Sequence, residues 1–206
     1  MDKVSILKYG TGNLNSITRA LNHFGAQVDL VQNTNEILKS NKLILPGIGA
    51  SRYVMDYLAA SERIHAISEF IEKERPVLGI CLGMQILLTE SEEFGSHNTL
   101  NIIPGKVLNI NRLAKKIISP HMGWTMTRII EKKKLSNKLI SKDNHFYFAH
   151  SYYCEVDEEN IYAYSSYSSH KVPTIISNNK NVWGTQFHPE LSSTQGLEII
   201  KNFIKM

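Results

Sequence analysis

The stretch Pro76-Val-Leu-Gly-Ile-Cys-Leu-Gly-Met-Gln-Ile-Leu-Leu88 predicts a strand that turns abruptly into a helix. Its first apolar run, residues 77–80, is typical of a buried strand, and residues 84–88 continue in a helical pattern. One glycine lies two residues before Cys81 and another two residues after it, which is the spacing of a nucleophile elbow. We expect the thiol to stand exposed at the helix N-terminus, where unpaired amides favour the thiolate. The alternative is a buried structural cysteine.

The composition is that of an ordinary globular chain. Of the 206 residues, 42% are hydrophobic and 20% are charged, which predicts one sizeable core and a single domain over residues 1–206. The net charge of +4 is mild, and the lysine run at residues 132–134 is better explained by a solvated face than by nucleic-acid binding. The chain has no run of 18 apolar residues and no basic-then-apolar leader, so we expect a cytoplasmic protein without membrane contact.

Strands and helices alternate over the first 90 residues. Strand-like runs are expected at residues 4–7, 27–31, 42–45 and 77–80. Helical segments are expected at residues 17–24, at 51–59, at 62–73 and, in a short helix with its cap at Thr34 or Asn35, after the second strand. This alternation predicts an α/β fold with a doubly wound, mostly parallel sheet. Sites in such sheets gather beyond the carboxyl ends of the strands, so the turns after the first, third and fourth strands should meet near Cys81.

From residue 100 onward the pattern changes to short strands. We expect them at residues 102–103, 106–110, 125–130, 146–148, 152–156, 162–167, 174–177 and 182–186. Their spacing predicts antiparallel additions in the C-terminal half. A final amphipathic helix is expected from Thr194 to Ile204.

The sequence Trp183-Gly-Thr-Gln-Phe-His-Pro-Glu190 places a histidine and a carboxylate directly after an apolar strand. A cysteine nucleophile needs a base that can reach it and a group that orients the base. His188 ends its strand at the same kind of position as Cys81, and Glu190 can bend back to the imidazole. These three residues form a candidate triad. Alone, His188 is equally well explained as a satisfied polar residue at a strand end, because the chain has 8 histidines.

Two backbone amides are candidates for an oxyanion hole. One belongs to Leu82, directly after the nucleophile. The other belongs to Ile48 in Pro46-Gly-Ile-Gly49, where a glycine on either side frees the peptide to turn toward the site. A turn with no catalytic role would have the same sequence features. The two cysteines of the chain form neither a disulfide framework nor a CxxC pair, the histidines lack metal-ligand spacing, and Gly10-Thr-Gly-Asn13 is not a full dinucleotide fingerprint. We therefore expect no metal and no cofactor.

Five motifs carry a resemblance to a known family. They are Pro46-Gly-Ile-Gly49, Gly79-Ile-Cys-Leu-Gly-Met-Gln85, His121-Met-Gly-Trp124, Tyr147-Phe-Ala-His-Ser-Tyr152 and Gly184-Thr-Gln-Phe-His-Pro-Glu190. Together they resemble the motifs of the class I (triad) glutamine amidotransferases and, within that family, of the HisH glutaminase subunits of imidazole glycerol phosphate synthase. The resemblance covers nearly the whole chain and implies a flavodoxin-like fold. It also implies that Cys81 attacks the carboxamide of L-glutamine, with His188 as the acid and base and Glu190 holding the imidazole.

The resemblance further implies how the substrate and a partner are held. The positions that match glutamine-binding residues are Gly49, Gln85, Glu93, Ser151 and Tyr152. Trp124 and Tyr147 match an apolar contact surface for a HisF-like (β/α)8-barrel synthase subunit. In the family this subunit completes a heterodimer and receives the ammonia through its core, using it on a nucleotide-derived substrate.

Two departures from the family pattern leave the acceptor of the ammonia open. Leu191 stands where HisH chains commonly carry a basic residue, and Lys8 stands where an acidic residue is common. HisH-like paralogues supply ammonia for the amidination of a surface sugar, so this pathway remains an alternative to histidine biosynthesis. A cysteine peptidase or deglycase of the same fold is a further alternative. A non-catalytic subunit with a dead site is another, although the intact set of Cys81, His188 and Glu190 argues against it.

Overall fold

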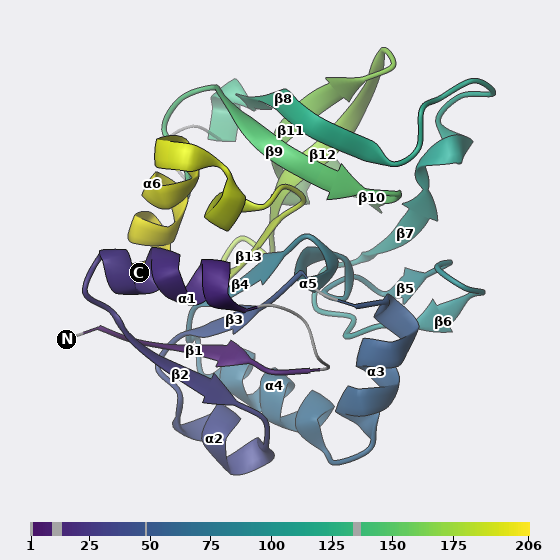
Figure 1. Ribbon diagram of the computed structural model, residues 1–206. Coiled ribbons are helices and arrows are strands. Elements are labelled where there is room, and N and C mark those ends of the chain that lie inside the picture. The colour runs from purple at the N-terminus through teal and green to yellow at the C-terminus, as the bar shows by residue number, and fades with distance from the viewer. Residues whose placement is uncertain (1, 10–13, 48, 134–136) are drawn as a thin grey trace.

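Five parallel strands form one half of a nine-stranded sheet, in the order β2-β1-β3-β4-β13 (Figure 1). The structure is a computed structural model that describes residues 2–9, 14–47, 49–133 and 137–206. The five strands are β1 (Lys3–Leu7), β2 (Gln27–Val31), β3 (Leu43–Leu45), β4 (Val77–Ile80) and β13 (Val182–Thr185). Each neighbouring pair is parallel, so the arrangement predicted for the first 90 residues is confirmed, and β13 extends it from the far end of the chain.

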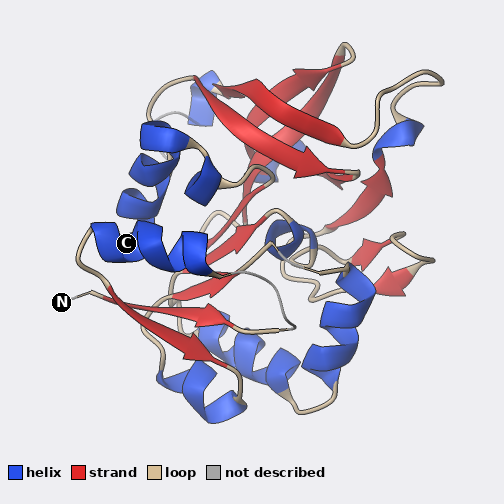
Figure 2. Cartoon of the chain, viewed as in Figure 1, coloured by secondary structure: helices blue, strands red, loops and turns tan. Residues whose placement is uncertain are grey.

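Helices cover both faces of this parallel half, as Figure 2 shows in blue against the red strands. One face carries α1 (Asn15–His23) and α6 (Ser193–Ile204), and the other carries α2 (Thr34–Lys39), α3 (Ser51–Ala59) and α4 (Arg63–Glu72). Two apolar clusters match these faces: one joins α1 and α6 to the sheet, and the other joins α2, α3 and α4 to it. The doubly wound arrangement is therefore confirmed. No helix in the described ranges is long and apolar enough to cross a membrane.

The N-cap of helix α2 lies one residue before the earlier of the two predicted positions. Asn33 is its N-cap, and its side chain accepts the N–H of Glu36 at 3.0 Å. The Glu36 carboxylate accepts the Asn33 N–H in return, which completes a capping box. The expectation of a cap at Thr34 or Asn35 was therefore wrong, because the asparagine before them has its glutamate partner at the required spacing.

Four antiparallel strands extend the sheet from β13, in the order β12-β11-β8-β9. They are β8 (His121–Ile129), β9 (Asn144–His150), β11 (Ile161–Tyr167) and β12 (His170–Ser177). The antiparallel additions predicted for the C-terminal half are confirmed for these four strands. The strand expected at residues 182–186 differs, because β13 runs antiparallel to β12 but parallel to β4. Strand β8 starts four residues earlier than its expected start at Thr125, because residues 121–124 pair with residues 147–150 of β9.

A second sheet of four strands, β10-β7-β5-β6, packs against this antiparallel half. Its strands are β5 (Glu90–Ser91), β6 (His97–Asn98), β7 (Gly105–Asn109) and β10 (Tyr152–Val156). The two short strands β5 and β6 were not expected from the sequence. A third apolar cluster, which includes Met84, Val107, Cys154 and Ile176, joins this sheet to β12 and to the segment after Cys81. Single-turn helices complete the described chain: η1 (Ile110–Arg112), η2 (Glu131–Lys133), η3 (Glu158–Asn160) and η4 (Pro189–Leu191).

The segment after Cys81 is less helical than its apolar pattern predicts. Helix α5 (Leu82–Gln85) makes one turn only. The carbonyls of residues 86–88 accept N–H groups from residues 100–103 at 2.7 to 3.0 Å, and these long-range bonds replace further helical ones. The expected strand at residues 102–103 does not form for the same reason, since its N–H groups are used here.

Candidate active site

Cys81 occupies the sharp turn between β4 and α5. Its φ of 50° and ψ of −104° lie in a region that residues with a Cβ rarely adopt. The Cys81 N–H donates to the Thr185 carbonyl at 2.7 Å, so the turn is held by β13. Both flanking glycines are needed: a Cβ on Gly79 would lie 2.5 Å from the Gly83 carbonyl oxygen, and one on Gly83 would lie 1.9 Å from that of Leu45. The backbone therefore has the elbow geometry that the sequence predicts.

The thiol of Cys81 is covered, with only 7% of the residue exposed. Its Sγ lies 3.7 Å from Nε2 of Gln186 and 3.9 Å from the Ala149 carbonyl oxygen. The Gly47 backbone lies against it, because a Cβ built there would be 2.8 Å from Cys81 Cβ and 3.1 Å from Cε1 of His188. The expectation of an exposed thiol was wrong because β9, the chain after β13 and the turn after β3 close around it. The one-turn helix also limits the dipole contribution that we expected.

His188 and Glu190 approach Cys81 from the turn that follows β13. Nδ1 of His188 lies 2.8 Å from Oε1 of Glu190. The backbone of His188 is fixed from both sides, since its N–H donates to the Tyr147 carbonyl at 2.9 Å and its carbonyl accepts the Ser192 hydroxyl at 2.6 Å. Burial lowers the pKa of His188, but hydrogen bonding to Cys81 and Glu190 outweighs it and raises this pKa to about 10. The site therefore favours the imidazolium form of His188.

The turn after β3 is tied to the first strand by a buried tyrosine. Tyr9 donates its hydroxyl to the carbonyl of Pro46. Burial and the nearby Cys81 raise the pKa of Tyr9 well above its ordinary value, so its hydroxyl remains a donor. This bond sets the plane of the Pro46–Gly47 peptide, which lies directly beside the nucleophile. Gly49, further along the same turn, has a φ of 89° that favours glycine.

Of the two amides predicted for an oxyanion hole, the structure places one. Leu82 is the first residue of α5, so its N–H has no acceptor within the helix. It follows Cys81 directly and lies at the same turn. Ile48 lies outside the described residues.

Gln85, one turn beyond Cys81, is buried within the site. Its Nε2 donates to the Tyr152 carbonyl at 3.0 Å and to Oε1 of Gln186 at 3.2 Å. Gln186 in turn reaches Sγ of Cys81 with its own amide nitrogen. Gln85 therefore connects the Ser151–Tyr152 turn to the nucleophile.

The side chain of Glu93 binds the N-terminus of helix α3. Its Oε2 accepts the N–H of Ser51, the first residue of α3, at 2.6 Å. A carboxylate at a helix N-terminus is stabilised by the unpaired amides there. The Glu93 N–H donates to the Ser91 hydroxyl at 3.2 Å, which holds the residue in place. If Glu93 contacts a substrate as predicted, it does so while Oε2 stays hydrogen-bonded to α3.

Sequence reasoning missed Gln186, although this residue is fully buried and contacts the candidate nucleophile. A signal was present, because Gln186 and His188 are two residues apart in an extended segment. Side chains at that spacing point to the same side. The histidine pair His121 and His150 was also missed, and its contact depends on the pairing of β8 with β9.

Strands β8 and β9 present an exposed apolar surface beside the site. Trp124 is 51% exposed and Met122 is 64% exposed. The ring of Trp124 packs edge-on against that of Tyr147, with 6.3 Å between the ring centroids. The Tyr147 carbonyl accepts the His188 N–H, so Tyr147 contacts both the apolar surface and the candidate base. Leu191, in the adjacent η4, is 47% exposed.

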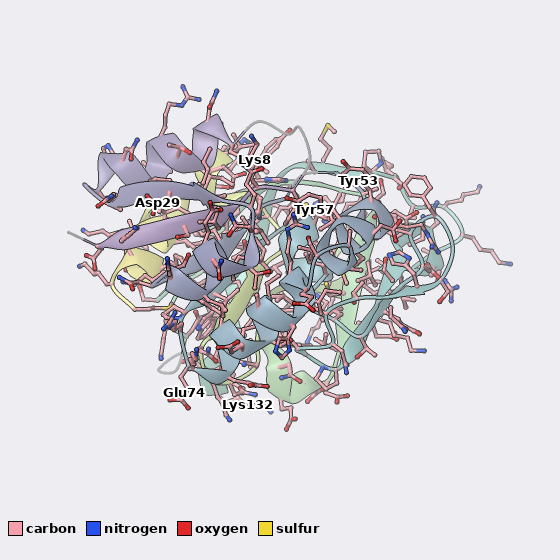
Figure 3. The ribbon with its side chains drawn as sticks, turned by 90° about the horizontal axis from the view of Figure 1, so that it is seen from below. Lys8, Asp29, Tyr53, Tyr57, Glu74 and Lys132 are labelled. Atoms are coloured by element: carbon pink, nitrogen blue, oxygen red, sulfur yellow. The ribbon has the colours of Figure 1, made fainter. Side chains whose placement is uncertain are left out.

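Other features of the described residues are separate from this site. Lys8 is exposed at the carboxyl end of β1, and Figure 3 shows it on the opposite side of the view from Glu74. Cys154 is buried in the third apolar cluster, where burial and the nearby Cys81 raise the pKa of its thiol. A cavity of about 440 Å³, lined in part by Ile129 and Tyr164, contains none of the site residues. Within the described ranges, no three His, Cys, Asp or Glu side chains are grouped to hold a metal ion.

Comparison with known proteins gives full-length matches. A family model described as glutamine amidotransferase class-I matches residues 5–206. The imidazole glycerol phosphate synthase subunit HisH of Methanosarcina acetivorans is 41% identical over 206 residues, which is 100% of both chains. The HisH subunit of Chlorobaculum tepidum is 39% identical over 97% of this chain and 98% of its own.

Solved structures agree in fold. A glutamine amidotransferase crystal structure superposes with a TM-score of 0.76 at 17% identity, covering 98% of this chain and 97% of its own. The structure of PurLQS from Thermotoga maritima superposes with a TM-score of 0.72 at 18% identity and the same coverage. At these identities the likeness concerns the fold.

Proposed function

This chain belongs to the class I glutamine amidotransferases and is an enzyme, and from that membership we propose that it is the glutaminase subunit of an imidazole glycerol phosphate synthase. Its HisH relatives are 39–41% identical over 97–100% of the chain, which supports this assignment. The observation that carries the proposal is the convergence of Cys81, His188 and Glu190 at the carboxyl ends of β4 and β13. We take residues 1–206 to act as a single cytoplasmic domain.

In the proposed reaction, Sγ of Cys81 attacks the side-chain carboxamide carbon of L-glutamine. The N–H groups of Leu82 and Ile48 hold the resulting oxyanion. The imidazolium of His188 gives its proton to the departing ammonia, which leaves a glutamyl thioester on the cysteine. His188 then takes a proton from water, which attacks the thioester and releases glutamate. Glu190 keeps the imidazole oriented through both steps.

The glutamine molecule itself is held by Gly49, Gln85, Glu93 and the Ser151–Tyr152 backbone. The position of Gln85 supports this, because its amide bridges the Ser151–Tyr152 turn and Gln186 next to the nucleophile. Glu93 follows β5 and the turn lies between β9 and β10, so a ligand between them would be contacted from two segments that are distant in the sequence.

The ammonia is used by a HisF-like (β/α)8-barrel subunit, which makes imidazole glycerol phosphate and AICAR in histidine biosynthesis. The exposed apolar surface at Trp124 and Met122 supports a protein partner there, since contiguous exposed apolar side chains mark interaction sites. Tyr147 ties that surface to the backbone of His188. We therefore expect low glutaminase activity in the isolated chain and higher activity in the heterodimer, with ammonia passed directly to the barrel.

A second candidate acceptor is a surface sugar that is amidinated with the same ammonia. Leu191 supports this alternative. It is exposed and borders the Trp124 surface, and it stands at a position where HisH chains commonly carry a basic residue. A peptidase or deglycase of the same fold is distinguished by incubation with glutamine: only the amidotransferase accumulates a glutamyl thioester on Cys81.

The central test replaces Cys81 with alanine in the complex with the barrel subunit. Glutamine-dependent synthesis of imidazole glycerol phosphate should be abolished, while synthesis from added ammonia should be retained. The matched control is Cys154→Ala, which removes the other thiol and should keep both activities. Loss of both activities in Cys81→Ala would contradict the channelling proposal.

A further inference from the structure

A line of hydrogen bonds runs from β8 to the nucleophile through two buried histidines. Nε2 of His121 lies 2.8 Å from the Thr125 hydroxyl, and Nδ1 of His121 lies 2.9 Å from Nε2 of His150. Nδ1 of His150 lies 2.7 Å from the Tyr152 carbonyl oxygen. That oxygen also accepts from Gln85, which leads through Gln186 to Sγ of Cys81. His121 and His150 are 3% and 5% exposed.

The direction of each bond in this line is determined by its end at Tyr152. A carbonyl only accepts, so Nδ1 of His150 carries a hydrogen and donates. In the neutral ring Nε2 of His150 then accepts, which makes Nδ1 of His121 the donor and leaves Nε2 of His121 to accept the Thr125 hydroxyl. Both rings must be neutral for this arrangement. Burial lowers the pKa of His150 to about 3 and that of His121 to about 4, so at neutral pH they are.

The carbonyls of the Ser151–Tyr152 turn accept hydrogen bonds from within the protein. The Tyr152 oxygen accepts two hydrogen bonds, one from His150 and one from Gln85. The Ser151 oxygen accepts the N–H of Ile110 at 2.9 Å. A carbonyl oxygen has two lone pairs, so the Tyr152 oxygen has reached its capacity. These hydrogen bonds hold the turn in place beside Gln85.

Aromatic packing holds the first histidine of the line in place. The ring of His121 stacks on Phe148, with 4.7 Å between the ring centroids, and on Tyr167, with 4.1 Å. A ring packed on both sides cannot turn its Nδ1 away from His150 without moving these neighbours. His121 therefore fixes the orientation of the His150 ring.

We propose that His150, oriented by His121, is a positioning residue for glutamine hydrolysis: it holds the Tyr152 carbonyl, and through it the Gln85 and Gln186 amides, in place around Cys81. The inference rests on the proposed glutaminase function and assigns no chemical step to either histidine. Without the His150 donor, the Tyr152 oxygen keeps only one partner. The Gln85 amide, which uses one hydrogen on Tyr152 and the other on Gln186, then loses a fixed anchor.

The test compares His150→Leu with His150→Asn in the full chain bound to its barrel subunit. The amide nitrogen of an asparagine side chain occupies the place of Nδ1 and donates to the same carbonyl, whereas leucine fills space without donating. The probe is 6-diazo-5-oxo-L-norleucine, a glutamine-shaped diazoketone that alkylates the cysteine. We expect His150→Leu to raise the half-saturating probe concentration about 10-fold, with a limiting inactivation rate within about 3-fold of wild type, and His150→Asn to stay close to wild type.

Two outcomes would overturn the inference. The first is a half-saturating probe concentration in His150→Leu equal to that of the wild type. The second is an equal increase of this concentration in His150→Leu and His150→Asn, which would mean that the ring only fills space. Thermal unfolding shows whether each variant is folded. If His150→Leu does not fold, the same comparison is made with His121→Leu and His121→Asn. Failure of the wild-type complex to be labelled at Cys81 would instead reject the glutaminase function itself.

Discussion

Glu190 reaches back to His188 with 2.8 Å between its Oε1 and the imidazole Nδ1, while its other carboxylate oxygen is buried without a hydrogen-bond partner among the described residues. A buried carboxylate is costly unless an opposite charge lies beside it. The imidazolium of His188 supplies that charge, so the pair is stable mainly when His188 is protonated. The same bond fixes which ring nitrogen faces Cys81.

Replacing Glu190 with glutamine should disable the base without removing it. The amide nitrogen of glutamine can donate to Nδ1, which stabilises the tautomer with its hydrogen on the wrong nitrogen. We expect kcat for glutamine hydrolysis to fall by roughly 100- to 10 000-fold, as for the orienting carboxylate of other triads. The measurement is glutamate release by the complex, with Glu198→Gln on the exposed face of α6 as the matched control. Unchanged turnover in Glu190→Gln would remove Glu190 from the mechanism.

The pKa of His188 should depend on the nucleophile. Burial lowers this pKa, and the largest opposing cause is hydrogen bonding to Cys81, followed by that to Glu190. In Cys81→Ser the sulfur that makes this contact is replaced by a hydroxyl oxygen, so the pKa of His188 should fall below its value of about 10 in the wild type. An NMR titration of the His188 ring in both proteins measures this. An identical titration would mean that Cys81 and His188 do not interact in solution.

Adding a methyl group at Gly47 should act on catalysis more than on stability. Its Cβ would lie 2.7 Å from the Ile80 carbonyl oxygen and 2.8 Å from Cβ of Cys81, so the nucleophile or the turn must move. We expect Gly47→Ala to lower kcat by about 100-fold, because small misplacements of reacting groups are costly. The control is Gly25→Ala, at a φ of 74° with nothing within 4 Å, which should cost about 1 kcal/mol of unfolding free energy and leave kcat unchanged. Equal turnover in both variants would contradict the prediction.

Truncating Trp124 should weaken the complex with the barrel subunit. A half-exposed tryptophan at the centre of an apolar surface is the kind of residue that dominates binding energy. We expect Trp124→Ala to raise the Kd about 30-fold, equivalent to about 2 kcal/mol, as measured by calorimetry. Leu30→Ala is the control, since Leu30 is 50% exposed on β2 at the opposite edge of the sheet. A similar Kd for both variants would place the partner elsewhere.

Stability should fall in acid because two histidines are buried in their neutral form. Burial lowers the pKa of His121 to about 4 and that of His150 to about 3, against 6.5 in the unfolded chain. Between these values the unfolded state binds more protons than the folded state, so the unfolding free energy decreases as pH falls below about 6.5. Each histidine contributes a slope of about 1.4 kcal/mol per pH unit within its window. Urea unfolding at several pH values should therefore show a shallower acid decline in His150→Asn than in the wild type, and equal slopes would refute the assignment.

The parallel half of the sheet and the His188–Glu190 pair were predictable because local sequence determines both. Each strand from β1 to β4 is a short apolar run bounded by turn residues, and the histidine and glutamate are only two positions apart. The elbow was predictable from the two glycines around Cys81, whose absent side chains the backbone requires. These features need no knowledge of distant contacts.

The contents of the site were harder to predict because they depend on pairing between distant segments. His121 meets His150 only through the register of β8 with β9, and Gln186 meets Gln85 across 101 residues. The burial of Cys81 depends on Ala149 and Gly47, which lie far from it in sequence. Strands β5 and β6 are two residues long, too short for an alternating pattern to mark them.

The backbone strain at Cys81 means that catalytic activity and thermal stability favour different residues at this position. A residue with a Cβ at a φ of 50° and a ψ of −104° costs on the order of 1–3 kcal/mol, which glycine would relieve. Library screens that reward survival on heating and screens that reward glutamine turnover are therefore expected to disagree there. Directed evolution toward a more thermostable enzyme should hold this position constant and seek its gains in the helices that flank the sheet.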